Sequence, residues 1–322
     1  MTRKPQSPRE TFAAALERRP IVGQVPTFEL VFFLTMEAFG RVHPQHRDYA
    51  QWDQMWAEER DLHRDDIADL LVRTADRFGH AAIVLHANPT RVEEVMHIAD
   101  RVRHATGDRY FLLTNMDPTF SIPSGDEMPE FCYRMVDDPE GLKEEAEARV
   151  AAVLEDAQRL ARHGAVDGIT MCADYCFNRG PFLRPEQFHE LVFPYLRTTI
   201  AALRELDLYV IKHTDGNILP ILDDLLASNP HALHSLDPQG GIDMADIKAR
   251  AGNQVCLIGN VNCSLLDTGS DEEYLASARY ALRHGMPDFG YIFSTSNCVY
   301  TGMRLSRYER LLELLRTEGR YG

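Results

Sequence analysis

The residues best suited to chemistry follow an apolar run in the middle of the chain. Residues 209–212 are Tyr-Val-Ile-Lys, and His213, Asp215 and Asn217 come directly after them. An imidazole and a carboxylate at positions i and i+2 can bind a divalent metal or transfer a proton. Helical sequence follows over residues 218–227, and the order of apolar strand, polar tip and helix is how α/β enzymes present reactive side chains. Because one His-x-Asp pair is a weak signal, its meaning depends on whether other strands end in the same way.

Polar residues of similar chemistry follow the other apolar runs of the chain. They are Glu29, His86, Asn115, Asp174, Tyr175, Asn178, Asp237, Asn260, Asn297 and Cys298. Because loops are solvated, many such residues need no function, but the scarcity of lysine and arginine beside them is less expected. Carboxylate, imidazole, amide and thiol groups together suit a divalent metal or proton transfer better than a polyanionic ligand.

Three of these residues are candidate ligands of a zinc ion. A closed barrel would bring His213, Asp215 and Cys298 to one face, and imidazole, carboxylate and thiolate can hold Zn²⁺ while leaving a position open for substrate. Glu29 is the candidate for a further ligand, or else it caps the helix that follows it. The structural alternative is that His213 bonds to a backbone carbonyl, Asp215 caps the next helix and Cys298 is a small buried apolar residue. Acid–base chemistry without a metal is the third interpretation.

Asp174 and Tyr175 precede a Gly-Pro turn, and we predict that they act with His213 and Asp215 as catalytic residues. The other strand-end residues are predicted to bind polar groups of the substrate, and they are Glu29, His86, Asn115, Asn178, Asn217, Asp237, Asn260 and Asn297. Structural alternatives stand beside some of these predictions. His86 could merely fill the barrel mouth, and Asp237, which precedes a proline, could be a turn residue.

Short apolar runs of strand type carry these residues. They cover residues 21–26, 81–86, 110–115, 168–173, 209–211, 232–236, 255–259 and 291–295. Helical sequence follows each run, most clearly over residues 139–163, where apolar residues recur with the 3-4 spacing of a buried helix face. Alternation of strands and helices implies parallel pairing with the helices outside.

The number of repeats favours a closed (β/α)8 TIM barrel over an open sheet. A doubly wound sheet is the alternative, but no G-x-G-x-x-G follows the first strand to support dinucleotide binding. Because no change of composition suggests a linker, we predict a single domain over residues 1–322. A helical extension over residues 1–20 precedes the barrel, which covers residues 21–322.

Composition restricts the partners of the protein. The 322 residues include 34 Lys+Arg and 49 Asp+Glu, for a net charge of −15, which argues against binding to nucleic acid or an anionic membrane. The sequence has no apolar run near the roughly 20 residues that span a bilayer and no apolar signal-peptide stretch near Met1. The six cysteines lack the dense spacing of a disulfide scaffold. We therefore expect a cytoplasmic protein with reduced thiols.

Several motifs resemble those of the uroporphyrinogen decarboxylase superfamily, and together they cover roughly residues 160–315. The motifs are Gly168-Ile169 through Asp174, Arg184-Pro185-Glu186-Gln187-Phe188, Phe193-Pro194-Tyr195, His213-Thr214-Asp215-Gly216-Asn217, Asp237-Pro238, Ile258-Gly259-Asn260-Val261-Asn262 and Ser294-Thr295-Ser296-Asn297. The resemblance implies a TIM barrel, in agreement with the strand count. It also implies a homodimer.

The superfamily contains two chemistries. Its decarboxylases grip the carboxylates of uroporphyrinogen with an arginine-rich segment after the first strand, but residues 26–33 of this chain contain no arginine. Its corrinoid-linked methyltransferases bind zinc through a His-x-Cys motif after strand five and a distant cysteine near strand eight. His213 and Cys298 match two of these ligands, and Asp215 replaces the middle cysteine. A carboxylate can also bind zinc.

The resemblance therefore favours a zinc-dependent methyltransferase that acts on a small thiol or methylated substrate. Asp174, Tyr175 and Asn217 would orient the substrate, and a separate corrinoid protein would be the methyl partner, because this chain has no His-Gly corrinoid-binding module. The first alternative is a cofactor-independent carboxy-lyase that decarboxylates a small acid other than uroporphyrinogen. The second is a barrel that binds a small ligand without catalysis.

Overall fold

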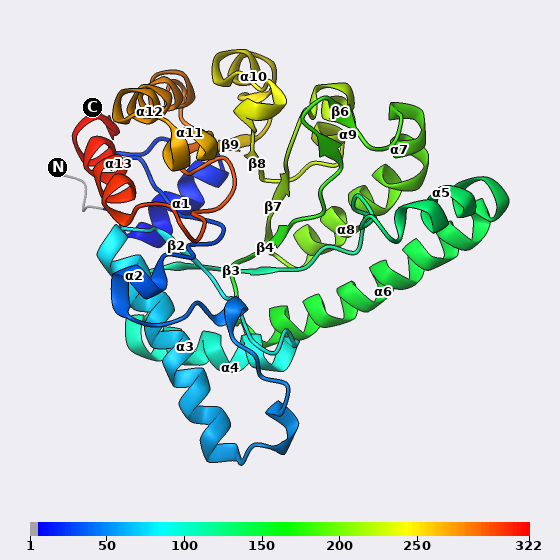
Figure 1. Cartoon of the computed structure of the whole chain (residues 1–322), viewed down its shortest axis with the longest axis horizontal. Coiled ribbons are helices and arrows are strands. Elements are labelled where there is room, and N and C mark those ends of the chain that lie inside the picture. Colours follow the sequence, from blue (N-terminus) through cyan, green and yellow to red (C-terminus); the bar gives the residue numbers. More distant parts are fainter. Residues whose placement is uncertain (1–5) are drawn as a thin grey trace.

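The computed structural model describes residues 6–322 and shows a parallel sheet that curls round with helices on its outside (Figure 1). The neighbouring strands follow the order β10-β9-β8-β7-β4-β3-β2, and every pair is parallel. Their bounds are β2 (Ala82–Val84), β3 (Phe111–Asn115), β4 (Gly168–Met171), β7 (Tyr209–Thr214), β8 (Ala232–Ser235), β9 (Cys256–Ile258) and β10 (Tyr291–Ile292). Each of these strands lies within or overlaps a predicted apolar run.

The segment around Thr27 lies between the two outermost strands of this sheet. Thr27 forms a parallel bridge with Phe293, whose N–H donates to the Pro26 carbonyl at 2.9 Å. On the other side, the Ala81 N–H donates to the Thr27 carbonyl at 2.7 Å. This segment takes the eighth position of the barrel, so the predicted TIM barrel is confirmed.

The predicted first strand over residues 21–26 was wrong in its position. In the structure β1 (Gly23–Gln24) pairs antiparallel with β11 (Arg320–Tyr321), and the barrel strand comes just after it. Gly23 has φ of 97°, a conformation that favours glycine, so the chain turns there instead of running straight into the barrel. Apolarity alone could not separate these two pairings, because the half-buried residues Gly23 and Gln24 run directly into the buried segment 25–28.

Helices surround the sheet and follow the predicted alternation. They are α1 (Pro8–Leu16), α2 (Thr35–Phe39), α3 (Ala57–Phe78), α4 (Val92–Thr106), α5 (Met128–Asp137), α6 (Pro139–His163), α7 (Pro185–Leu191), α8 (Phe193–Glu205), α9 (Leu222–Ala227), α10 (Met244–Ala251), α11 (Cys263–Thr268), α12 (Asp271–Gly285) and α13 (Leu305–Glu318), with short 3-10 turns η1 (Pro44–His46), η2 (Trp52–Gln54), η3 (Leu219–Ile221) and η4 (Pro238–Gly240). A capping box of Ser270 and Glu273 is present at the start of α12.

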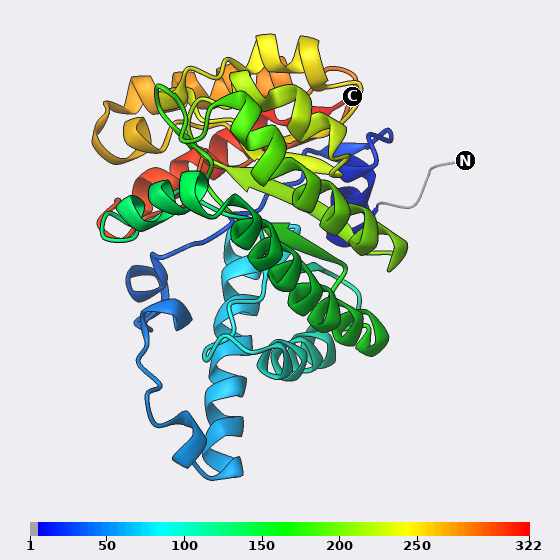
Figure 2. The ribbon, with the colours of Figure 1, turned by 90° about the vertical axis from the view of Figure 1, so that its right-hand side faces the viewer.

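Some elements went unpredicted. The region over residues 34–78 divides into α2, two 3-10 turns and α3, and Figure 2 shows this part extending away from the barrel. The loop over residues 117–130 leads into α5, and the hairpin of β5 (Cys176–Phe177) and β6 (Gly180–Pro181) follows β4. Within residues 6–322, none of the helices combines the length and apolar character that crossing a bilayer requires.

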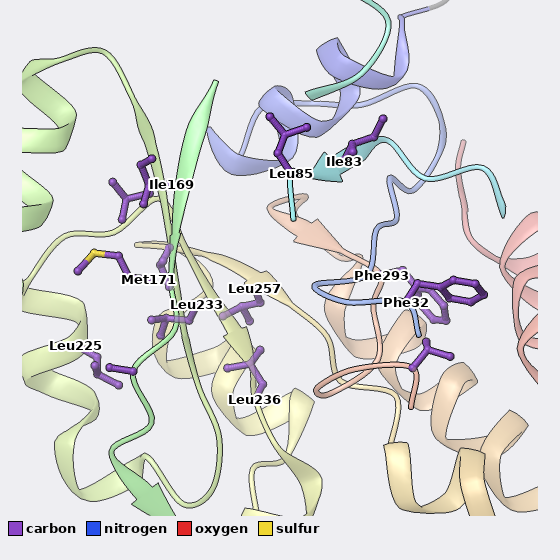
Figure 3. Packing of buried hydrophobic residues seen from close by; sticks show 14 of the residues in the cluster. Phe32, Ile83, Leu85, Ile169, Met171, Leu225, Leu233, Leu236, Leu257 and Phe293 are labelled. Carbon is purple, nitrogen blue, oxygen red and sulfur yellow. The ribbon is translucent and has the colours of Figure 1, made fainter. Parts of the chain in front are cut away.

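The apolar core has two parts that together leave the carboxyl ends of the strands for chemistry. Residues such as Ile83, Ile169 and Leu257 pack between the sheet and the outer helices (Figure 3). Inside the barrel, Phe12 of α1 packs with barrel residues that include Phe111. Because α1 covers the amino-terminal end of the barrel, polar side chains inside it gather toward the opposite end.

Candidate active site

The ends of β4 and β7 bring three potential ligands together. The Nε2 atom of His213 lies 3.8 Å from Asp174 Oδ1 and 3.7 Å from Asp215 Oδ1. One ligand atom from each of the three residues lies within 4.8 Å of the other two. His213 is buried on β7, whereas the side chains of Asp174 and Asp215 are 45% and 25% exposed. The cluster therefore combines a fixed imidazole with two carboxylates that a ligand can reach.

The ring of His213 is oriented by a second histidine. Its Nδ1 lies 2.8 Å from Nδ1 of His234, which is its neighbour in register on β8, and this leaves Nε2 facing the carboxylates. Burial lowers the pKa of His213 to about 3, and the charge of Lys212 acts in the same direction. Burial also lowers the pKa of His234 well below its usual value. Both rings are therefore neutral near pH 7, as metal ligation by histidine requires.

Asp215 is held by donors on two other strand ends. The Ser235 hydroxyl donates to Oδ1 at 2.6 Å, and the Asn297 amide donates to Oδ2. Burial and the charges of Asp174 and Asp237 together raise the pKa of Asp215 to about 7, against the lowering effect of these hydrogen bonds. The Asp215 N–H in turn donates to Asp174 Oδ1 at 3.0 Å. A nearby cation would therefore stabilise the ionised form of Asp215.

A buried lysine fixes the turn that carries Asp174. Lys212 Nζ donates to Asp117 Oδ2 at 2.8 Å, to the Ala173 carbonyl at 2.9 Å and to the Met171 carbonyl at 3.3 Å. Asp117 Oδ2 also accepts from the Ala173 N–H at 2.9 Å. Sequence reasoning noted Lys212 only as a nearby cation. Its side chain holds residues 171–173 and so sets the position of the carboxylate that follows them.

Tyr175, a predicted catalytic residue, belongs to this lysine network. Its hydroxyl forms a hydrogen bond of 2.6 Å with the Thr119 hydroxyl, which also donates to Asp117. The Lys212 ammonium lies 4.2 Å from the centre of the Tyr175 ring, a distance typical of a cation–π contact. The buried hydroxyl is therefore engaged next to the cluster and is not one of the three groups around His213.

Glu29, a predicted metal ligand, lies outside the three-residue cluster. Its Oε2 accepts from the Thr295 hydroxyl at 2.5 Å, the Thr295 N–H at 3.2 Å and the Ser294 hydroxyl at 3.2 Å. Its Oε1 accepts from the Tyr308 hydroxyl at 3.2 Å. Burial raises the pKa of Glu29 to about 7. Because protein donors already occupy both oxygens, this carboxylate offers little to a metal.

Cys298, the other predicted ligand outside the cluster, lies in a small apolar group with Leu30 and Val31. The adjoining backbone explains this position, since the Val299 N–H donates to the Val31 carbonyl at 3.0 Å. Burial raises the pKa of the Cys298 thiol far above its usual range in the metal-free protein. The expected set of His213, Asp215, Cys298 and Glu29 is therefore not assembled, and Asp174 stands in the third place.

Several predicted substrate-binding residues hold the backbone near the site. Asp237 accepts from the Gln239 N–H at 2.9 Å and the Gly216 N–H at 3.4 Å. The Asn260 amide donates to the Leu236 carbonyl at 2.9 Å. Asn217 accepts from the Leu219 N–H at 3.2 Å. The contacts of Asp237 match its interpretation as a turn residue, and Asn217 and Asn260 likewise bond to backbone groups.

Three other predicted residues lie further out. His86 forms a hydrogen bond of 2.9 Å with the Leu30 carbonyl through Nε2, and with Asn115 it lines a cavity of about 290 Å³ between β2, β3, α4 and α6. Asn178 is exposed in the turn between β5 and β6. Asn297 is thus the member of the predicted substrate-binding set that directly contacts the cluster, through Asp215.

Sequence reasoning missed His234 and Ser235. Both lie on β8, a strand that was predicted, but His234 was treated as part of an apolar run. The signal lay in the pairing of adjacent strands, because His213 and His234 are partners in the parallel register. Placing the two predicted strands side by side would have brought the imidazoles together.

Comparison with known proteins complements this geometry. The family model for uroporphyrinogen decarboxylase (URO-D) matches residues 72–318. A methyltransferase from Methanosarcina mazei superposes with a TM-score of 0.74 at 16% identity, over 97% of this chain and 98% of that chain. D-psicose 3-epimerase from Clostridium cellulolyticum H10 gives 0.49 at 12% identity, over 85% and 98%. No curated protein matches the sequence. At such identities the structural likeness concerns the fold alone.

Proposed function

The chain belongs to the uroporphyrinogen decarboxylase family, and we propose that it is a zinc-dependent methyltransferase acting on a small thiol or methylated substrate. The observation that carries this proposal is the cluster of Asp174, His213 and Asp215 at the barrel mouth. The similar fold of the Methanosarcina mazei methyltransferase supports the reaction class.

The three side chains fit a divalent metal. They offer one neutral imidazole nitrogen and carboxylate oxygens, which are ligands that zinc accepts in catalytic sites. The cation would neutralise two carboxylates whose mutual repulsion helps to raise the pKa of Asp215. Because both carboxylates are partly exposed, a substrate could reach the same place. Nitrogen and oxygen ligands alone would make this a harder site than one with thiolates.

A bound Zn²⁺ would supply Lewis acidity that lowers the pKa of a thiol, so that a thiolate is available at neutral pH. The protein would hold the ligands in place. His234 orients His213, Ser235 and Asn297 orient Asp215, and the Lys212 network positions the turn before Asp174. The methyl group would arrive on a separate corrinoid protein, which we infer from the family and not from a surface of this chain.

Metal analysis tests this function. Protein purified without chelator and supplemented with zinc should contain about one zinc per chain, because three ligands converge on one place. His213→Ala and Asp174→Ala should lose it. Cys298→Ala is the matched control and should keep it, since the thiol lies in an apolar group. Metal-free wild-type protein would overturn the proposal, and zinc loss in Cys298→Ala would restore the thiol as a ligand.

One observation favours a second candidate, the cofactor-independent carboxy-lyase. An aspartate with a pKa of about 7, such as Asp215, can return a proton to a carbanion near neutral pH. On this proposal, carbon dioxide release from a small carboxylic acid should persist in the presence of chelator and disappear in Asp215→Asn. Release that survives Asp215→Asn would exclude this role for the residue.

A further inference from the structure

A continuous row of buried polar groups connects His213 to Glu29 across the barrel interior. His213 Nδ1 lies 2.8 Å from His234 Nδ1, and His234 Nε2 lies 3.5 Å from the Ser294 hydroxyl. That hydroxyl donates to Glu29 Oε2 at 3.2 Å. Each of the four side chains is buried. The row thus begins at the three-residue cluster and ends at a carboxylate that does not belong to it.

The two histidines allow two arrangements of protons. Each neutral imidazole carries one N–H, so only one of the two facing Nδ1 atoms of His213 and His234 can be protonated. In the first arrangement the proton is on Nδ1 of His213, and Nε2 presents a lone pair to Asp174 and Asp215. In the second, Nε2 of His213 carries the proton. A metal can bind Nε2 only in the first arrangement.

The acceptor at the far end selects between them. Above a pH of about 7 the carboxyl group of Glu29 is ionised and only accepts hydrogen bonds, so the single hydroxyl proton of Ser294 then points toward it. The Ser294 oxygen is then free to accept from Nε2–H of His234, which leaves Nδ1 of His234 to accept from Nδ1–H of His213. In the second arrangement the Ser294 hydroxyl would donate to Nε2 of His234. Its oxygen would then face the Glu29 carboxylate with no proton between them.

Distances favour the first arrangement. His234 Nε2 lies 3.5 Å from the Ser294 hydroxyl, which lies 3.2 Å from Glu29, whereas Nε2 of His213 lies 3.7 and 3.8 Å from the carboxylates it would need as acceptors. The His234 ring also has a hydrogen bond with the Thr295 backbone. Glu29 itself cannot turn away, because Thr295 and Tyr308 also donate to its two oxygens. The fixed end of the row is therefore Glu29.

We propose that Glu29, acting through Ser294 and His234, holds His213 in the tautomer with its proton on Nδ1 and so keeps Nε2 free for a metal. Glu29, Ser294 and His234 are positioning residues, since none of them belongs to the three-residue cluster. The functional consequence rests on the proposed metal-dependent function. The tautomer itself does not, because it is a property of the metal-free protein.

Nitrogen-15 NMR of metal-free protein with labelled histidine tests the tautomer directly, at pH 8.5 so that Glu29 is ionised. Spectra of His213→Asn identify the signals of the missing ring. In the wild type we expect the proton of His213 on Nδ1. In Ser294→Ala and in Glu29→Gln, which remove the donor and the obligate acceptor, we expect a mixture of both tautomers.

Matched variants separate positioning from general structural damage. Ser294→Thr keeps the hydroxyl and should restore the wild-type tautomer. Ser228→Ala removes another buried serine hydroxyl, one that donates to the Leu225 carbonyl, and should leave His213 unchanged. Zinc titration should show affinity weaker by about tenfold in Ser294→Ala but not in the two controls, as for other groups that orient metal-binding histidines.

Two results would overturn the inference. One is a wild-type His213 with its proton on Nε2, and the other is an unchanged Nδ1–H tautomer in both Ser294→Ala and Glu29→Gln. Failure of the proposed function would look different. If the tautomers change as expected but the wild type binds no zinc, the positioning role of Glu29 is supported and the metal-dependent function is not.

Discussion

Two groups of acids at the barrel mouth differ in how their charge is compensated. Asp117 has a lysine partner, because the buried ammonium of Lys212 lies 2.8 Å from its Oδ2. Asp174 and Asp215 have only the neutral ring of His213 between them. Within residues 6–322, no lysine or arginine forms an ion pair with either of these two carboxylates.

The arrangement of β7 explains the difference. Successive side chains of a strand point to opposite faces, so Lys212 points away from the barrel interior toward Tyr175, while His213 points inward toward His234. The protein thus supplies a cation to the carboxylate on one face and none to the pair on the other. Within residues 6–322, Asp174 and Asp215 therefore lack a compensating positive charge, which a bound cation would supply.

The largest effect should come from breaking the compensated group. Lys212→Met would leave Asp117 buried without its cation and remove hydrogen bonds to two carbonyls. Breaking a buried pair from one side costs about 3–5 kcal/mol, and urea unfolding should show a loss of that size. The double variant Lys212→Met/Asp117→Asn should recover much of it. Equal losses in the single and double variants would contradict a charge-based role for the lysine.

A fourth carboxylate, Glu29, has four hydrogen-bond donors and no ion-pair partner within residues 6–322. Burial raises its pKa to about 7, so the folded state keeps a proton that the unfolded chain releases near its ordinary pKa. Its contribution to the free energy of unfolding is therefore present at low pH and is lost as the pH rises toward 7.

Removing this carboxylate should change the pH dependence of stability. A shift from the usual value of 4.5 to about 7 corresponds to about 3 kcal/mol. Relative to the wild type, Glu29→Gln should gain stability by up to that amount between acid and neutral pH, with chelator present throughout. Urea unfolding at several pH values measures the difference. A constant difference between the two proteins would show that the pKa of Glu29 is the same in the folded and the unfolded chain.

The sequence predicted the barrel and the central pair of residues but not the full cluster. His213 and Asp215 could be identified because they follow one strand, where their spacing alone places them together. Asp174 comes from the neighbouring strand β4 and was predicted as catalytic, but not as a partner in metal binding. Asp174 lies close to His213 because Lys212 holds the turn before it. Lys212 acts from the opposite face of β7, and such an effect leaves no local pattern in the sequence.

The separation of Cys298 and Glu29 from the three-residue cluster has an equally physical cause. Cys298 comes after a strand end, as expected, but its segment pairs with residues 31–33 and carries the thiol into an apolar group. Glu29 also comes after the barrel segment, yet donors from Ser294, Thr295 and Tyr308 surround it. Strand order alone gave the correct end of the barrel for both residues. Which side chains meet there depends on backbone pairings that single-sequence patterns do not contain.

The smallest effect should come from removing one negative charge from the pair of Asp174 and Asp215. Asp174→Asn keeps an oxygen that can accept from the Asp215 N–H but removes one negative charge. Because the Asp174 side chain is 45% exposed, solvent screening limits the gain in stability of metal-free protein at pH 8 to a few tenths of a kcal/mol, or about 1 at most. The pKa of Asp215 should fall, since the charge of Asp174 helps to raise it. Carbon-13 NMR of the labelled carboxyl group measures this pKa, and Asp126→Asn on the exposed surface is the control.

Zinc addition should reverse the order of stability, because only the wild type retains all three ligands and gains free energy from binding. If Asp174→Asn and the wild type respond equally to zinc, the two carboxylates do not share a cation, and the contrast with Asp117 reflects exposure alone.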